Sequence, residues 1–457
     1  WTSTDSGGTW TEDTSVGSTK NWFSITSSSD GTKLAAVVYG GNIWTFEAPS
    51  PPSTSAWTLV GDDVDGSTDD YLGYSVSMNL DGKRMAVGAY YSSLYEDYGG
   101  YVRVFQYDQT NTAWQQMGAD IIPSALGEKR GMMVSMSGDG MRVASIGNHH
   151  DNSDTSGLVK VHEWNSDSQS WTLMSGFDST SKPYVVALSA DGTRVAFIHY
   201  AFPGYYLSVY ELGSDETWSQ VGNKLNFIHQ ELSHAVALSK NGNRVVLGFP
   251  TVAGSDLGYI QVYELDSSET TWTKIGEIEG DSGAPAGAFG NSVAISADGS
   301  RVVVGAPGVW VPALEYADTF GIEPYVRVYD LISGSWVQRG GDITKGQSGR
   351  YPYAFGQSVD MSDDGSLIAV RALTFYQNGK SSTLLYRLDT ATDVWKRTGS
   401  DIEEEMAGDS DTGDGGAMYR QLSLSGDGKY VAIGAFLNDG GGTDAGHVRV
   451  YKDQSAP

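Results

Sequence analysis

FGNSVAISADGSRVVVGAP, residues 289–307, and YVRVYDLISGSWVQRGGDI, residues 325–343, together contain one complete copy of the pattern that decides the fold. Apolar residues alternate in SVAIS and in YVRVY, which predicts strands with one buried face. RVVVG is nearly continuous, which indicates a strand covered on both faces. The ADG triplet between the first two strands predicts a tight turn, because glycine adopts a positive φ without steric cost. A fourth strand is expected to begin near Trp336.

Both the turn and the Trp-led segment recur along the whole chain, with a period of about 50–65 residues. The turns begin at Asp30, Asp81, Asp139, Asp191, Asn241, Asp298, Asp364 and Asp427. The Trp-led segments contain Trp10, Trp57, Trp114, Trp171, Trp218, Trp272, Trp336 and Trp395. Repeats of four short strands are typical of β-propellers. We therefore predict an all-β chain that forms a single closed β-propeller over residues 1–457, with about eight four-stranded blades; seven blades is the alternative.

The two ends of the chain suggest how the ring closes. The eighth third strand ends near Tyr451 with no Trp-led segment after it, whereas the segment around Trp10 precedes the first repeat. We expect this N-terminal strand to complete the last blade, which removes the free sheet edges. Because the chain starts at Trp1, it is expected to be a piece of a longer protein or to have lost a leader.

Charge and composition argue against several classes of function. The chain has 29 basic and 56 acidic residues, a net charge of −27. Such a surface repels phosphate, so we expect no nucleic-acid partner. Cysteine is absent, which removes disulfides, thiolate metal sites and thiol catalysis. No apolar run approaches the about 20 residues that span a bilayer, so the chain is not expected to cross a membrane.

FGNSVAISADG with RVVVGAP, FGQSVDMSDDG and LGYSVSMNLDG resemble the FG-GAP repeats of integrin-α-like β-propellers. The closer likeness is to a variant common in large secreted proteins of marine algae and microbes. STDSGGTW at residues 3–10 is similar to the Asp-box of other propellers, which makes the first blade different. The resemblance implies the architecture and a secreted setting. Integrin-type repeats carry a D-x-D-x-D-G calcium loop between the first two strands; this chain has only the short DG turn there.

Strand order predicts which loops share a face. The DG turns and the third-to-fourth connections lie on one face, which we call the DG-turn face. The second-to-third loops and the blade-to-blade crossovers lie on the other, which we call the loop-rich face. Long loops fall on the latter, and aromatic residues in such loops pack against a protein or stack on a sugar. The candidate interaction residues are Tyr95, Tyr98, Trp310 and Tyr316.

Acidic residues gather in loops of the same face. Ca²⁺ binds six to eight oxygens, which carboxylates in a loop supply. If a cation binds, we expect Ca²⁺ here and not in the DG turns; the alternative is that these carboxylates are simply solvated. The candidate ligands are Asp62, Asp63, Asp65, Asp69, Asp409, Asp411, Asp414 and Asp439.

Catalytic signatures such as GxSxG, HExxH and the Walker sequence are absent. We therefore expect a non-enzymatic extracellular or cell-surface propeller that acts as a structural or protein-interaction module through its loop-rich face, within a larger assembly. The alternative is a carbohydrate-binding or carbohydrate-active propeller of the glycoside hydrolase or lyase type. That alternative requires two carboxylates about 5–10 Å apart at the mouth of the central channel.

Overall fold

The structure is a computed structural model in which the chain divides into two compact units, Trp1–Thr54 and Ser55–Pro457. The first unit contains an antiparallel sheet of β1 (Trp22–Ser27), β2 (Lys33–Val38) and β3 (Ile43–Glu47), in that order. These strands are what the structure describes of that unit. Of the second unit it describes residues 57–95, 98–124, 127–147, 159–174, 182–202, 204–227, 235–250, 258–281, 288–308, 324–345, 354–373, 380–404 and 421–454.

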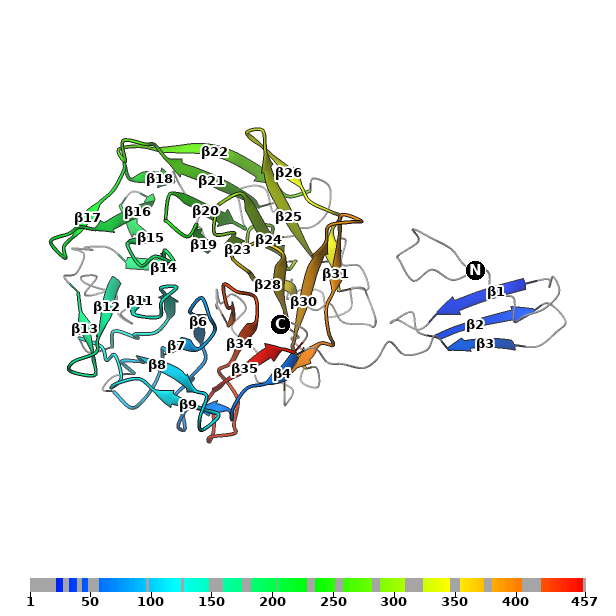
Figure 1. Ribbon diagram of the computed structural model, residues 1–457, viewed down its shortest axis with the longest axis horizontal. Coiled ribbons are helices and arrows are strands. Elements are labelled where there is room, and N and C mark those ends of the chain that lie inside the picture. Colours follow the sequence, from blue (N-terminus) through cyan, green and yellow to red (C-terminus); the bar gives the residue numbers. More distant parts are fainter. Residues whose placement is uncertain are drawn as a thin grey trace. The chain divides into compact units, whose positions relative to one another are not determined.

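Within these residues, the second unit forms seven antiparallel four-stranded blades arranged around a ring (Figure 1). Blade 1 consists of β6 (Ser75–Met78), β7 (Arg84–Ala89), β8 (Tyr101–Asp108) and β9 (Ala113–Gln116); blade 2 of β10 (Met133–Met136), β11 (Arg142–Ile146), β12 (Val159–Asn165) and β13 (Ser170–Leu173). Blade 3 consists of β14 (Lys182–Leu188), β15 (Arg194–Ala201), β16 (Gly204–Leu212) and β17 (Trp218–Gln220); blade 4 of β19 (Ala235–Leu238), β20 (Arg244–Phe249), β21 (Tyr259–Leu265) and β22 (Trp272–Glu279).

The remaining blades follow the same strand order. Blade 5 consists of β23 (Ser292–Ile295), β24 (Arg301–Ala306), β25 (Tyr325–Ile332) and β26 (Ser335–Gln338); blade 6 of β28 (Ala354–Met361), β29 (Leu367–Leu373), β30 (Ser382–Asp389) and β31 (Val394–Arg397); blade 7 of β33 (Leu422–Leu424), β34 (Tyr430–Ala435), β35 (His447–Asp453) and β4 (Trp57–Leu59). Short strands from the crossovers also pair with a third strand: β5 (Val64–Asp65) with β35, β18 (Leu225–Phe227) with β16, β27 (Ile343–Thr344) with β25 and β32 (Ile402–Glu403) with β30. No helix that could span a membrane occurs in the described part of the chain.

The prediction of eight blades is therefore wrong, and the alternative of seven is correct. The repeat with the turn at Asp30 lies in the separate sheet β1–β3 of the first unit. The outer strand of blade 7 is β4, whose Trp57 is the partner of Asp453 in β35. Closure by the segment around Trp10 is not confirmed, because β4 holds the outer position of blade 7 that was predicted for it. The segment itself, with the Asp-box-like residues 3–10, lies outside the described residues.

The DG turns connect the first two strands of every blade, as predicted. In blade 5, Gly299 has a φ of 71°, which an L-residue with a Cβ rarely adopts. Asp298 Oδ1 accepts hydrogen bonds from the backbone of Ser300 at 2.9 Å and from Ser296 Oγ at 2.7 Å. The aspartate thus satisfies the turn backbone.

A series of backbone hydrogen bonds links the seven blades at the DG turns. Each N–H donor lies at or just before the Asp or Asn of one turn, and each acceptor lies in the turn of the next blade. The bonds run from Leu80 to Gly138, Gly138 to Ala190, Asp191 to Lys240, Lys240 to Ala297, Ala297 to Asp363, Asp363 to Gly426 and Asp427 to Leu80. The series returns to the residue from which it started, so the DG-turn face holds the blades together through the backbone itself.

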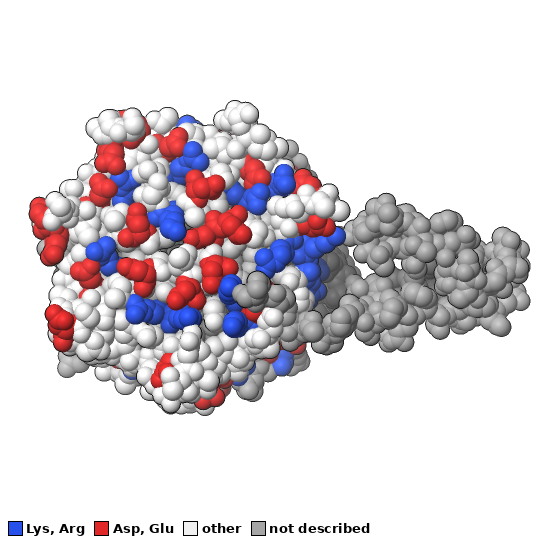
Figure 2. Space-filling model, in the orientation of Figure 1, with Lys and Arg blue, Asp and Glu red and all other residues white. Residues whose placement is uncertain are grey.

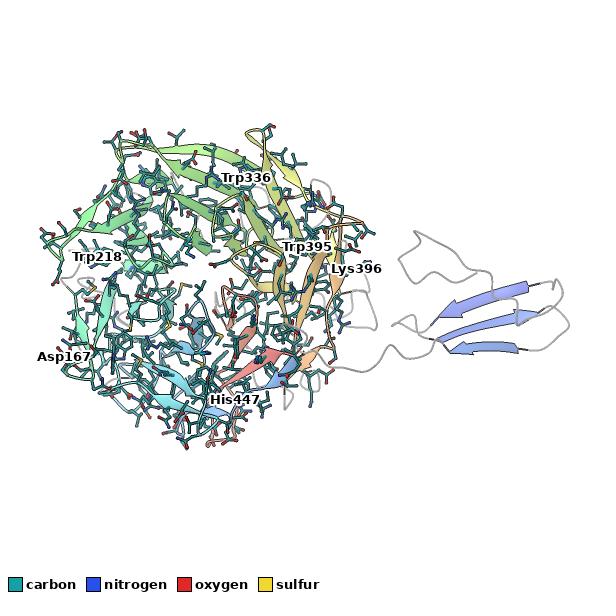
Figure 3. The ribbon with its side chains drawn as sticks, viewed as in Figure 1. Asp167, Trp218, Trp336, Trp395, Lys396 and His447 are labelled. Carbon is teal, nitrogen blue, oxygen red and sulfur yellow. The ribbon has the colours of Figure 1, made fainter. Side chains whose placement is uncertain are left out.

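Tryptophans of the Trp-led segments lie on the outer strands, as Figure 3 shows for Trp218, Trp336 and Trp395. Several indoles donate a hydrogen bond to a carbonyl of the preceding blade. The bonds are Trp114 to Val60 at 3.0 Å, Trp171 to Met117 at 2.7 Å, Trp272 to Val221 at 3.2 Å and Trp395 to Arg339 at 3.0 Å. These side chains therefore join neighbouring blades.

Pairs of glycines allow the blades to approach closely at the loop-rich end of four seams. A Cβ added to Gly305 in blade 5 would lie 2.1 Å from the carbonyl oxygen of Gly356 in blade 6. The same contact joins Gly88 to Gly131, Gly248 to Gly290 and Gly434 to Gly73. The other three seams carry Ile146, Ile198 or Arg371 at the first position. In each of the four glycine seams, the two glycines therefore contact each other across the boundary between neighbouring blades.

Candidate binding sites on the loop-rich face

Three loops meet on the loop-rich face where blade 7 adjoins blade 1. They are the crossover 62–73, the second-to-third loop of blade 1 and the loop 436–446 of blade 7. The N–H of Asp69 donates to Thr443 O at 2.8 Å and that of Leu72 to Ala445 O at 3.0 Å. The N–H of Ser93 donates to Asp69 O at 3.4 Å. These bonds fix the crossover between the two loops.

A cluster that we call the tyrosine surface lies on this frame and consists of Tyr71, Tyr91, Tyr98 and Lys129. Tyr98 stacks on Tyr91 with ring centroids 4.6 Å apart and an interplanar angle of 20°. Tyr71 contacts Tyr91 edge-on at 5.8 Å, and Lys129 Nζ lies 4.7 Å from the Tyr91 centroid. Tyr98 is 47% exposed. These stacking and cation–π contacts hold the rings of the cluster in place and leave the ring of Tyr98 accessible to solvent.

Three of these four residues have left-handed backbone conformations: φ is 55° at Tyr71, 54° at Tyr98 and 49° at Lys129. Each costs a residue with a Cβ about 1–2 kcal/mol. Ala288 occupies the same position in blade 5 as Tyr71 and Lys129 in blades 1 and 2, and its φ is 50°. The fold thus imposes the conformation, whereas the side chain placed on it differs from blade to blade.

Exposed aromatic side chains of the described residues lie only on the loop-rich face. They are Tyr98 in blade 1 and, at the hairpin between β15 and β16, Tyr200 at 39% and Phe202 at 89% exposure. Tyr200 contacts the ring of Tyr205 at 5.2 Å. Sequence reasoning missed Tyr200 and Phe202, although YAFPGYY at residues 200–206 carries a visible excess of aromatics.

Tyr95, a predicted interaction residue, is partly buried. Its hydroxyl bonds to Asp120 Oδ2 at 3.1 Å, and its ring contacts Tyr101 edge-on at 5.9 Å. Burial and the neighbouring Asp120 carboxylate raise the pKa of Tyr95 to about 12. Tyr95 therefore supports the loop, and Tyr98 is the predicted residue that the structure exposes. Trp310 and Tyr316 lie outside the described residues.

The predicted cation ligands are not all brought together. Asp62 and Asp69 are exposed, and Asp409, Asp411 and Asp414 lie outside the described residues. Asp439 Oδ1 accepts a hydrogen bond from Asp444 N at 2.8 Å within its own loop. Calcium at these positions stays a prediction.

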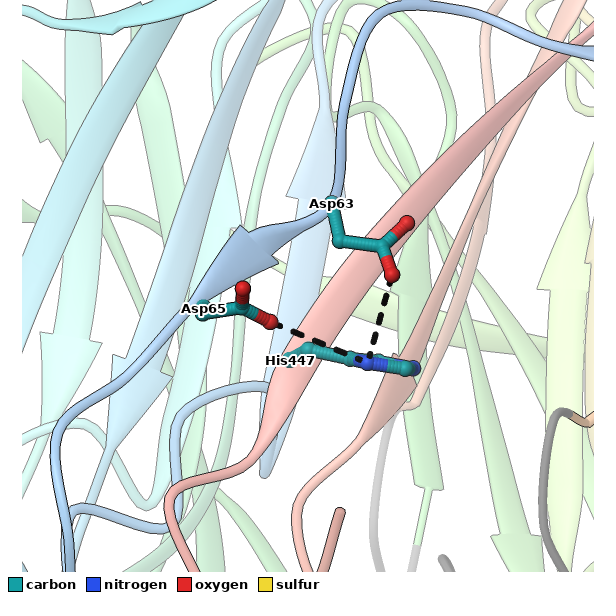
Figure 4. Close-up of side chains that lie close together, drawn as sticks. All are labelled: Asp63, Asp65 and His447. Atoms are coloured by element: carbon teal, nitrogen blue, oxygen red, sulfur yellow. Dashed lines mark ion pairs between the residues drawn. The ribbon is translucent and has the colours of Figure 1, made fainter. Parts of the chain in front are cut away.

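Asp63 and Asp65 do meet, and they share a buried histidine that sequence reasoning missed. β5 pairs with β35 so that Asp65 lies opposite His447. His447 Nδ1 is 3.9 Å from Asp63 Oδ2 and 4.0 Å from Asp65 Oδ1 (Figure 4). Arg449 Nε and Nη2 donate to Asp63 at 2.7 and 2.6 Å, and the Arg449 guanidinium lowers the pKa of the Asp63 carboxyl.

The Arg449–Asp63 pair repeats an arrangement found in two other blades. Arg103 pairs with Asp120 in blade 1 and Arg327 with Asp342 in blade 5, at 2.9 and 2.7 Å. In those blades the arginine also lies over a tyrosine, Tyr101 or Tyr325, at 4.4 or 4.3 Å from the ring centroid. His447 takes the place of this tyrosine in blade 7. The pair is thus a repeated anchor of the crossover, and the histidine is particular to blade 7 among these three.

The carboxylate pair required by the carbohydrate-active alternative is not found on the described inner strands, β6, β10, β14, β19, β23, β28 and β33. Their sequences contain one carboxylate, Asp360. Its two oxygens accept hydrogen bonds from the backbone N–H groups of Met361 at 2.9 Å and Leu424 at 2.7 Å. Asp360 therefore joins blade 6 to blade 7.

The charge of the chain does not gather into one patch on the visible face. Figure 2 shows Lys and Arg interspersed with Asp and Glu over the face of the propeller turned toward the viewer. Mixed charges of this kind favour solubility over capture of a highly charged ligand.

Comparison with known proteins identifies the fold. No protein-family model matches the sequence, and no curated protein matches it. The chain is similar to the Cps50 (Swd1) β-propeller domain of Myceliophteria thermophila, with a TM-score of 0.52 and 10% identity over 86% of this chain and 98% of that one. It is also similar to a chain in the crystal structure of the Mitotic Checkpoint Complex, with a TM-score of 0.52 and 13% identity over 89% and 98%. At these identities the likeness shows the fold alone: an all-β, seven-bladed β-propeller.

Proposed function

We propose that this chain is a non-enzymatic interaction module, extracellular or at the cell surface, that binds a protein partner through its loop-rich face. The observation that carries the proposal is that the exposed aromatic side chains of the described residues, Tyr98, Tyr200 and Phe202, all lie on that face. Aromatic anchors dominate the energy of protein interfaces because they bury a large area with little loss of conformational entropy.

The DG-turn face offers less to a partner. Its turns keep nearly the same length in every blade, and their side chains bond within the turn or to the next blade. The resemblance of the repeats to FG-GAP propellers of secreted proteins supports the extracellular setting. β-Propellers commonly bind protein partners, which is consistent with an assembly role.

A glycan is the competing ligand. The open ring of Tyr98, stacked on Tyr91, suits a sugar ring as well as a protein side chain. A glycan array probed with the protein separates the two: binding that is lost in Tyr98→Ala would favour the glycan.

Photo-crosslinking tests the proposed face directly. A benzophenone amino acid is placed at Tyr98, at Phe202 or, as the control, at Ser300 in a DG turn. Each variant is exposed to the surface and secreted proteins of the producing organism. We expect one protein to be joined at Tyr98 or Phe202 and not at Ser300. Crosslinks to that protein mainly at Ser300 would overturn the proposal.

A further inference from the structure

We propose that Asp63, Asp65 and His447 form a binding site for a divalent transition-metal ion such as Zn²⁺. The site joins the crossover that begins the propeller to the third strand of its last blade. It is separate from the tyrosine surface and does not depend on the proposed function.

The pairing of β5 with β35 aims the four relevant side chains at one face. His447 lies opposite Asp65, and Val448 lies opposite Val64. Side chains two residues apart on a strand project from the same side, so Asp63 and Asp65 project together, as do His447 and Arg449. Val64 and Val448 project to the other side and are buried. The carboxylates and the imidazole therefore converge through the strand geometry itself.

The separations suit an ion better than direct hydrogen bonds. At 3.9 and 4.0 Å, His447 Nδ1 is too far from the two carboxylate oxygens for a hydrogen bond. One donor atom from each of the three residues can be chosen so that all lie within 4.8 Å of one another. Bonds of about 2.1 Å to a tetrahedral ion place ligand atoms about 3.4 Å apart, so the donor atoms have to close by at most about 1.4 Å to bind one.

The donor types select the class of ion. Imidazole nitrogen with carboxylate oxygen suits Zn²⁺ and its neighbours, whereas Ca²⁺ takes oxygen alone. His447 is 4% exposed, which holds its ring in place, and the side chain of Asp65 is 44% exposed. Water can therefore occupy the remaining coordination position. Arg449 donates to both oxygens of the Asp63 carboxylate and so holds this ligand in place.

Comparison with blades 1 and 5 provides a second observation. At the two positions occupied by His447 and Asp65, blade 1 has Tyr101 and Ile122, and blade 5 has Tyr325 and Thr344. Both changes to metal-binding residue types thus coincide in blade 7, at the seam where the first and last parts of the propeller meet.

Calorimetric titration of the chelator-treated full chain with Zn²⁺ tests the site. We expect one site whose Kd rises at least about tenfold in His447→Tyr, which restores the residue of blades 1 and 5, and in Asp65→Asn. Zn²⁺ should raise the Tm by roughly 2–4 °C in the parent protein only. Co²⁺ in place of Zn²⁺ should give a visible absorption that His447→Tyr abolishes.

Two control variants test whether Zn²⁺ binds at other histidines instead. His199→Gln removes a buried histidine that bonds to Ser208 in blade 3, and a His149→Ala/His150→Ala double variant removes the adjacent pair in the sequence. Neither should change the Kd. Absence of Zn²⁺ binding by the parent protein, or an unchanged Kd in the conservative and exposed Asp65→Asn variant, would overturn the proposal and leave an Asp–His ion pair only.

Discussion

The two ends of each blade differ in how much they vary. At the DG-turn end, the same kind of backbone hydrogen bond occurs at all seven seams, and the series of bonds ends at the residue where it began. At the loop-rich end, four seams carry a glycine contact and the other three carry Ile146, Ile198 or Arg371. The backbone hydrogen bond at the DG-turn end does not depend on which side chains are present. At the loop-rich end, by contrast, the contact between neighbouring blades depends on the residue at this position. The contacts between blades are therefore the same in every repeat at the DG-turn end, whereas they differ from seam to seam at the loop-rich end.

The seam between blades 6 and 7 is the extreme case. Arg371 replaces the glycine, and its guanidinium bonds to Glu404, Thr383 and the carbonyl of Gly434 in blade 7. The side chains of Arg371 and Glu404 are 1% and 4% exposed. Because a buried charge needs its partner, this seam depends on two charged side chains, whereas four of the other seams depend on a pair of glycines.

We expect the largest loss of stability from Arg371→Ala, which leaves the Glu404 carboxylate buried without the guanidinium. Removing one member of a buried ion pair typically costs about 3–5 kcal/mol. Urea unfolding followed by tryptophan fluorescence measures the change. The double variant Arg371→Met/Glu404→Met should recover most of the loss, since apolar residues can replace a buried pair. A loss below about 1 kcal/mol in the single variant would contradict this account of the seam.

Gly305→Ala should follow, at about 3 kcal/mol, because its Cβ would meet Gly356 O at 2.1 Å and Ser292 Oγ at 2.4 Å. The matched control is Gly341→Ala, where no atom lies within 4 Å of the added Cβ. Thermal and urea unfolding should distinguish the two variants clearly. Equal effects would show that the glycine pair does not set the distance between blades 5 and 6.

Arg244→Met tests a side-chain link on the DG-turn face. Arg244 donates to Glu264 at 2.6 Å and to Gly299 O of the next blade at 3.1 Å. The side chains of Arg244 and Glu264 are 21% and 43% exposed, so we expect a loss of about 1 kcal/mol. Lys274→Met, which breaks the exposed pair with Glu277, should change the unfolding midpoint by much less. A loss as large as that of Arg371→Ala would show that the side chains, and not the backbone ring, hold this face.

Acid should weaken the crossover anchors slightly. The Arg327 guanidinium lowers the pKa of the Asp342 carboxyl. A lowered folded-state pKa contributes stability above the unfolded pKa of about 4, and this contribution disappears as the pH falls through the folded-state value. Asp342→Asn should therefore reduce the difference in unfolding midpoint between pH 7 and pH 3. The effect is small because the Asp342 side chain is 39% exposed; an unchanged pH difference would remove the anchor from the account.

The architecture could be predicted from the repeat, but the number of blades could not. The sequence contains eight copies of the DG turn and of the Trp-led segment. This number is the same whether all eight repeats form blades of the propeller or one of them lies outside it. The number of blades is set by the pairing of Trp57 with β35 and by the separate sheet that β1–β3 form. That choice depends on long-range pairing between segments almost 400 residues apart, which local periodicity does not contain.

The candidate sites were partly visible in the sequence. The alternation in GDDVD and HVRVY contains the geometry of Asp63, Asp65, His447 and Arg449, but the register that joins the two segments follows from the ring. The tyrosine-rich loop was recognised, whereas its division into a partly buried Tyr95 and an exposed Tyr98 depends on Asp120 of the next crossover. Phe202 was missed because the exposure of a single side chain produces no periodic pattern in the sequence.

The most direct test of the division between the two ends is the affinity for the crosslinked partner, measured by surface plasmon resonance. Tyr98→Ala and Phe202→Ala are compared with Ser300→Ala in a DG turn, all with unfolding midpoints close to that of the parent. The account predicts that at least one aromatic variant raises the Kd by about tenfold or more and that Ser300→Ala leaves it unchanged. A Kd that rises with Ser300→Ala while both aromatic variants bind like the parent would contradict it.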